Sequence, residues 1–128
     1  LLRVARRLRH ATFTALTPLG LSPHQSRALR IIAAEQPVRP SALAARLHIN
    51  PRSATDVLDG LAERGWVERS PDPDDRRATL VSLTDAGRAL AGQVARMRHV
   101  ESERLFGQLD ADARAALRDA LLQLDREN

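Results

Sequence analysis

Polar side chains suited to nucleic-acid recognition follow the pair Asn50-Pro51 within the first turns of an expected helix. They are Arg52, Ser53, Thr55 and Asp56. A guanidinium can bind a phosphate or the major-groove edge of guanine, a hydroxyl can contact either, and a carboxylate can accept a hydrogen bond from N4 of cytosine. Backbone N–H groups without intrahelical acceptors add donors for phosphates at the start of a helix. This segment therefore predicts a helix that reads DNA in the major groove.

A second charged cluster lies in the polar run of residues 70–77. It contains Asp75, Arg76 and Arg77, and its proline and aspartate content predicts an exposed loop. An exposed guanidinium can enter an adjacent minor groove, most favourably a narrow A·T-rich one. The same residues would suit a soluble loop without a ligand, but the spacing of Asp75 and Arg77 favours a contact with DNA.

Capping residues and prolines predict the helices that must position these side chains. Ser22-Pro23 and Asn50-Pro51 each combine an N-cap side chain with proline at the first helical position. Apolar residues at helical spacing extend each of these helices, and Gly65 is placed to end the second one. Between them, Pro40-Ser41 begins a short helix that ends at His48-Ile49, and we count Ser41 among the DNA contacts. The short helix that begins at Pro40-Ser41 and the helix that follows Asn50-Pro51 are joined by a tight turn, and together they form a helix-turn-helix.

Two runs with strand character follow this helix-turn-helix. Residues 66–69 and 79–83 are rich in β-branched and apolar side chains, and the polar residues between them predict a hairpin with a long exposed loop. A charged hairpin directly after the second helix defines a winged helix-turn-helix. We therefore expect a mainly α fold with a small β-hairpin wing, whose DNA-binding lobe spans about residues 22–83.

Amphipathic helices are expected on both sides of this lobe, at residues 1–19 and 84–126. Thr84 and Asp110 are placed to cap the two helices of the second segment. Their apolar faces would carry Leu90, Val94, Met97 and Val100, and then Ala113, Leu117, Ala120, Leu121 and Leu124. A lobe this small cannot cover all of these faces, so we expect N- and C-terminal dimerisation helices and a homodimer. The whole chain of 128 residues is expected to form one domain.

Composition limits the class of protein further. The net charge is +4, all 20 basic residues are arginine, and residues 1–49 carry +7 whereas residues 50–88 carry −2. A basic first third favours an anionic partner, although charge alone suits a solvated arginine-rich surface equally well. The chain has no cysteine, which excludes disulfides and thiol-based sensing. No apolar run approaches the roughly 20 residues that span a bilayer, so we expect a cytoplasmic protein without membrane contact.

Catalytic and metal-binding patterns are absent from the sequence. It contains no nucleophile elbow, no glycine-rich phosphate loop and no HExxH, so we do not expect an enzyme. The four histidines are scattered without a convincing ligand spacing, and we expect neither a metal nor a cofactor. Trp66 is expected to pack at the base of the wing, and Met97 and Phe106 in the core.

Five segments of the chain, taken together, resemble the multiple-antibiotic-resistance regulator (MarR) family of transcription factors. They are Leu21-Ser22-Pro23-His24-Gln25, Leu43-Ala44-Ala45-Arg46-Leu47, Leu61-Ala62-Glu63-Arg64-Gly65-Trp66-Val67-Glu68-Arg69, Asp75-Arg76-Arg77 and Leu83-Thr84-Asp85-Ala86-Gly87. Each segment alone is a weak signal. Their order and spacing run continuously from about residue 21 to 90, and the flanking helices lie where the family has its dimerisation helices.

This resemblance implies a homodimer that binds a pseudo-palindromic operator in double-stranded DNA, usually as a repressor. It implies release from DNA when a small, often phenolic or lipophilic, effector binds between the dimerisation helices and the DNA-binding lobe. By position, Arg52, Ser53, Thr55 and Asp56 fall on the family's reading helix. The resemblance also implies that Asp75 braces the wing arginine, Arg77, which enters the minor groove.

Two positions depart from the family pattern, and one alternative function remains. The family commonly has basic residues where this chain has Asp56 and Gly60. Asp56 can serve as a base reader or can pair with Arg52 four residues earlier, and Gly60 costs the helix about 1 kcal/mol relative to alanine. The alternative to a DNA-binding regulator is a winged-helix module that binds another protein without specific DNA binding.

Overall fold

The computed structural model describes residues 1–126, and their regular secondary structure is helical apart from one β-hairpin and an isolated bridge between Val38 and Val81. The first helices are α1 (Leu2–Leu16), the short 3-10 helix η1 (Thr17–Leu19), α2 (Pro23–Glu35), α3 (Pro40–Leu47) and α4 (Pro51–Glu63). The hairpin consists of β1 (Val67–Asp72) and β2 (Asp75–Leu83), and the chain continues into α5 (Asp85–Phe106) and α6 (Ala111–Arg126). The expected mainly α fold with a hairpin wing is confirmed.

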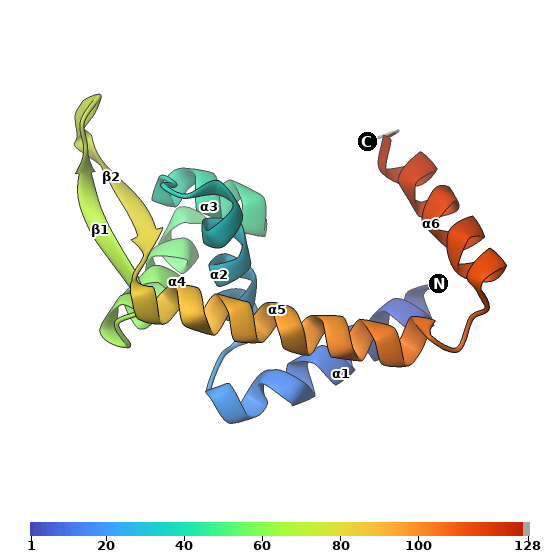
Figure 1. Ribbon diagram of the computed structural model, residues 1–128. Helices are drawn as coiled ribbons and strands as arrows, with labels where there is room; N and C mark the ends of the chain where they lie inside the picture. The colour runs from blue at the N-terminus through green and yellow to red at the C-terminus, as the bar shows by residue number, and fades with distance from the viewer. Residues whose placement is uncertain (127–128) are drawn as a thin grey trace.

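The elements form a compact lobe with an extended helical arm (Figure 1). Helices α2, α3 and α4 pack together, the hairpin projects beyond them, and α5 leads away from the base of the hairpin with α1 beside it. The core of the lobe is built from aliphatic side chains that are fully buried, including Leu29, Ile32, Leu43, Leu58 and Leu61. Burying these residues fixes the polar faces of α3 and α4 toward solvent.

The helix boundaries follow the capping residues. The side-chain oxygen of Ser22 accepts from the backbone N–H of Gln25 at 3.1 Å, while Gln25 Oε1 accepts from the backbone N–H of Ser22 at 3.0 Å. Thr84 Oγ1 caps α5 by accepting from Gly87 N, and Asp110 Oδ1 accepts from Ala113 N at the start of α6. These predictions are confirmed because a cap is a local interaction that the sequence displays directly.

The wing differs from the prediction of two short strands and a long loop. The strands extend to Asp72 and from Asp75, so only residues 73 and 74 form the turn. The pairing runs from Val67–Leu83 to Pro71–Thr79 and then shifts to Asp72–Asp75, which leaves residues 76–78 as a bulge in β2. The polar residues of this segment predicted a loop, but both faces of a projecting hairpin are solvated and accept polar side chains. Proline is also tolerated on an edge strand.

Parts of the two flanking segments remain exposed among residues 1–126. None of the residues of α6 is buried, and Leu121 and Leu124 are 44% and 56% exposed. Leu1, Leu2 and Val4 of the N-terminal segment are also exposed. The expectation that the apolar face of residues 113–124 turns inward is therefore not met within one chain. In Figure 1, α6 stands apart from both the lobe and α1.

The first helix is also shorter than expected. It ends at Leu16, and Gly20 ends the following η1 with a positive φ of 71°. None of the helices among residues 1–126 is both long enough and apolar enough to cross a membrane.

Candidate nucleic-acid interface

Helix α4 separates its side chains into a buried and an exposed face. Ala54, Leu58 and Leu61 are buried in the lobe, whereas the predicted DNA contacts Arg52, Thr55 and Asp56 are exposed and Ser53 is half-buried. Arg52 and Asp56 form no ion pair with each other or with other described residues, so the alternative in which they pair is not realised. Both charges are therefore available to a ligand.

The N-terminus of α4 offers fewer free amides than we expected. Asn50 Oδ1 accepts from the backbone N–H of Ser53 at 2.8 Å, and the carbonyl oxygen of Asn50 accepts from Ala54 N. Pro51 has no N–H. Among the described residues, only the amide of Arg52 remains without an acceptor in this turn. The side chain of Arg52 and not a set of backbone donors must then dominate any phosphate contact here.

Helix α3 has an uncapped N-terminus. Its N-cap residue, Arg39, makes no side-chain hydrogen bond to the helix, and the first backbone amide with an acceptor is that of Leu43. Ser41 is exposed in this first turn. The predicted contact Ser41 therefore sits where free amides and a hydroxyl can bind the same phosphate.

Gly60 of α4 lies next to the side chain of Gln25 of α2. A Cβ added at Gly60 would lie 2.9 Å from Nε2 of Gln25, whose other side-chain atom Oε1 is held in the capping box of α2. The departure from the family pattern at this position has a packing explanation. It costs helix propensity but leaves room for the side chain that caps the neighbouring helix.

The wing arginines lie in the bulge of β2. Arg76 and Arg77 are exposed and form no salt bridge with other described residues. Asp75 Oδ1 accepts a hydrogen bond from the backbone N–H of Arg77 at 3.0 Å. The resemblance implied that Asp75 braces Arg77, and the contact observed is to its backbone. Bulges often redirect side chains at functional sites, and both arginines of this bulge are exposed to solvent.

Two ion pairs, not predicted from sequence, attach the wing to the lobe. Arg69 Nη2 of β1 lies 2.6 Å from Asp59 Oδ1 of α4. Arg39 contacts Asp72 through Nε at 3.0 Å and Nη2 at 2.7 Å. Hydrogen bonds from the backbone N–H of Asp74 and from Arg39 lower the pKa of Asp72. These partners lie far apart in the chain, so spacing gave no signal for them.

The base of the wing is fixed by Trp66 and Arg64. The Arg64 guanidinium carbon lies 4.0 Å from the centre of the Trp66 ring, and Nη1 donates to the carbonyl oxygen of Gly20 at 2.9 Å. Trp66 is half-buried against the core, as predicted, and Met97 also packs against the core. Phe106 lies at the far end of α5 and is only half-buried.

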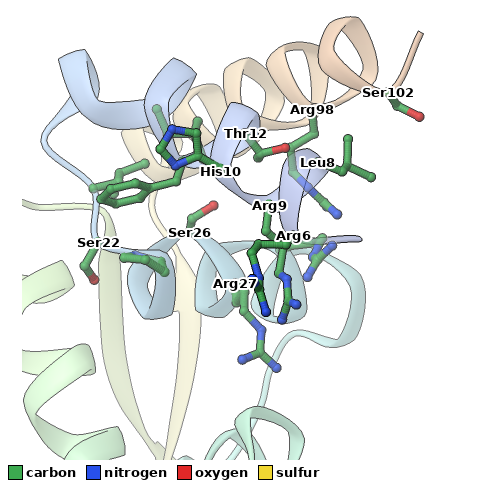
Figure 2. A pocket seen from close by; sticks show the side chains of 15 residues that line it. Arg6, Leu8, Arg9, His10, Thr12, Ser22, Ser26, Arg27, Arg98 and Ser102 are labelled. Carbon is green, nitrogen blue, oxygen red and sulfur yellow. The ribbon is translucent and has the colours of Figure 1, made fainter. Parts of the chain in front are cut away.

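A cavity of about 630 Å³ lies between α1, α2 and α5. Figure 2 shows labelled side chains from these helices around it. Its apolar lining includes Leu8, Phe13, Leu16 and Leu21, and its basic lining comprises Arg6, Arg9, Arg27, Arg30 and Arg98. Burial lowers the pKa of Arg30, and the like charges of Arg98 and Arg27 add to this effect. None of these arginines forms a salt bridge with other described residues.

The capped α4, the short α3 before it and the hairpin after it define a winged helix-turn-helix protein. The sequence pattern of the MarR family matches residues 21–79. An uncharacterized HTH-type transcriptional regulator of Mycobacterium leprae is 37% identical over 119 residues, which cover 93% of this chain and 80% of that protein. The chain therefore belongs to the MarR family of transcriptional regulators and is not an enzyme.

Solved structures agree with this assignment. A cysteine-to-serine mutant of MarR from Escherichia coli has a TM-score of 0.87 and 30% identity, covering 95% of this chain and 90% of that one. The same mutant complexed with operator DNA has a TM-score of 0.80 over 95% of this chain and 88% of that one. The transcriptional repressor CouR, bound to a 23-mer DNA duplex, has a TM-score of 0.83 and 28% identity, covering 96% and 87%.

Proposed function

We propose that this protein is a ligand-responsive repressor that binds a pseudo-palindromic operator as a homodimer. The observation that carries the proposal is the polar face of α4, where Arg52 and Asp56 are exposed and have no ionic partner among the described residues. Support comes also from two relatives of the same fold that were solved with DNA.

In this proposal each lobe contacts DNA through three regions, which are α4, the start of α3 and the wing. Helix α4 lies in the major groove, where Arg52, Ser53, Thr55 and Asp56 meet phosphates and base edges. The uncapped start of α3 binds a phosphate through Ser41. Arg77, supported by Arg76, reaches into the flanking minor groove. Because residues 50–88 carry a net charge of −2, affinity must rest on these few placed groups.

The dimer is proposed because the arm has apolar side chains without cover. Leu121 and Leu124 of α6 and Leu1, Leu2 and Val4 near the N-terminus are exposed. A second copy that covers these side chains would remove a large apolar area from water. Two lobes related by a twofold axis then require half-sites about one helical turn of DNA, roughly 34–36 Å, apart.

The cavity between α1, α2 and α5 is the proposed effector site. Its apolar walls suit a small lipophilic or phenolic body, and its arginines favour a ligand that carries negative charge. Helix α2 belongs to the lobe, whereas α1 and α5 form the arm. A ligand bound between these helices therefore changes the position of the arm relative to the lobe. A ligand that prefers the arrangement incompatible with DNA would release the operator.

Selection of DNA from a random pool tests this proposal. Wild-type protein should enrich a pseudo-palindrome, and its affinity for that duplex should fall steeply with salt because several phosphates are neutralised. Arg52→Ala should weaken binding by about tenfold, whereas Arg104→Ala, on the arm, should not. Failure to enrich any sequence would contradict the proposal and would favour a winged-helix module that binds another protein.

A further inference from the structure

We propose that Arg39 is a positioning residue for DNA binding, which orients the wing through Asp72 and thereby places Arg77. This inference rests on the proposed operator binding. Arg39 immediately precedes α3, and Asp72 is the last residue of β1. The pair therefore joins the start of the helix-turn-helix to the tip region of the hairpin.

Arg39 binds Asp72 through two hydrogen bonds to one carboxylate oxygen. Nε and Nη2 of Arg39 both donate to Asp72 Oδ2, at 3.0 and 2.7 Å. The other carboxylate oxygen, Oδ1, accepts from the backbone N–H of Asp74 at 2.9 Å. One carboxylate thus holds the hairpin turn on one side and α3 on the other. Its side chain is only 7% exposed, so water competes weakly for these bonds.

Asp72 occupies the point at which the strand pairing changes. The register shifts between Pro71 and Asp72, and the strand ladder leaves residues 76–78 unpaired. The bulge that contains Arg77 therefore lacks partners in β1 and depends on other contacts for its position. Asp72 lies directly across from Asp75, whose side chain accepts from the backbone N–H of Arg77. A short chain of contacts leads from Arg39 to Arg77.

Other hydrogen bonds and ion pairs that join the hairpin to the lobe, among the described residues, lie closer to the hairpin base. Val38 and Val81 exchange two backbone hydrogen bonds, at 3.0 and 2.8 Å. Gln36 Oε1 accepts from Leu83 N at 3.0 Å, and Arg69 pairs with Asp59. These bonds hold the base when Arg39 is changed, so the protein should still fold. The outer part of the hairpin would lose its connection to α3 and sample more orientations.

A double-mutant cycle tests whether Arg39 acts through Arg77. The probe is the operator duplex selected by the wild-type protein, and the proteins are Arg39→Gln, Arg77→Ala and the double variant. Arg39→Gln should lower affinity by about fivefold in the wild-type background and by less than about twofold in the Arg77→Ala background. Arg39→Lys should recover part of the loss, because an ammonium keeps the positive charge but not the paired N–H donors of the guanidinium. Arg104→Gln, which removes an ion pair within α5, is the matched control.

Hydrogen exchange of the free protein provides a readout that does not depend on DNA. Backbone amides of residues 74–78 should exchange faster in Arg39→Gln than in Arg104→Gln, while those of α4 should be unchanged. Unchanged exchange in the wing would overturn the inference. An equal loss of affinity in both backgrounds would overturn it too, since Arg39 would then act independently of Arg77. Faster exchange together with no effect of Arg77→Ala on binding would instead contradict the proposed wing contact with DNA.

Discussion

Asp75 holds the backbone of Arg77, not its guanidinium group. The Oδ1 atom of Asp75 accepts from the backbone N–H of Arg77, two residues later, at 3.0 Å and so closes an Asx-turn. The guanidinium forms no salt bridge with other described residues and is exposed. The wing therefore fixes where the Arg77 side chain begins and leaves its charged end available.

Replacement of Arg77 by alanine should weaken operator binding without changing the oligomeric state. Loss of one groove-inserted guanidinium is expected to cost about 1–3 kcal/mol of binding free energy, which lowers the affinity by roughly fivefold to more than a hundredfold. Fluorescence anisotropy with a labelled operator measures the affinity, and light scattering measures the mass. An affinity within about twofold of wild type would contradict the wing assignment.

Two glycines of α5 should respond to alanine in opposite directions. A Cβ at Gly87 would lie 1.9 Å from the carbonyl oxygen of Trp66, so Gly87→Ala must displace the wing base or the helix. Gly92 faces only Arg96 Nη1, at 3.4 Å. We expect Gly87→Ala to lower the free energy of unfolding by about 1–3 kcal/mol, and Gly92→Ala to raise it by up to about 1 kcal/mol. Urea denaturation of both variants measures the difference, and equal effects would contradict the close packing at Gly87.

Asp72 should contribute to stability in a pH-dependent manner. Its folded-state pKa lies below its ordinary value of 3.8, because the Asp74 amide and Arg39 bind the carboxylate. The stabilisation is therefore fully present at pH values well above the ordinary pKa of 3.8. It is lost as the pH falls through the folded-state pKa. Asp72→Asn should be less stable than wild type at about pH 6, and the gap should narrow toward about pH 3. A gap that widens on acidification would contradict the assigned direction.

Dimerisation should depend on the exposed leucines of α6. Wild type is expected to have the mass of a dimer by light scattering at about micromolar concentration, because apolar side chains of its arm are exposed among residues 1–126. Replacing both Leu121 and Leu124 by aspartate should yield a monomer, since both are exposed in the single chain and a buried carboxylate would be unpaired. Circular dichroism checks that the lobe remains helical. A wild-type monomer would contradict the proposed dimer.

Local signals in the sequence predicted most of the helical framework. Ser22, Asn50, Thr84 and Asp110 cap helices as expected, because each forms a hydrogen bond to an amide three residues later. The exposed positions of Arg52 and Asp56 followed from the spacing of buried residues on α4. These features depend on neighbours in the chain and can be inferred from spacing alone.

Features that depend on distant parts of the chain were missed. Residues 70–72 have low strand propensity, yet they pair with β2 because the backbone ladder continues from Val67. Arg39 and Asp72 are separated by 33 residues, and only the fold brings them together. The apolar face of α6 was predicted, but it is not buried by any part of the chain that the structure describes. Tertiary and quaternary contacts thus limit what the sequence alone can predict.

The most direct test of the central claim is the affinity of the protein for a selected duplex as a function of salt. We expect a dimer bound to a pseudo-palindrome, with log affinity falling linearly against log salt by about 0.9 per phosphate neutralised. Scrambling the half-sites should abolish most of this affinity. Equal affinity for selected and scrambled duplexes would contradict the assignment of α4 and Arg77 as a sequence-specific DNA interface.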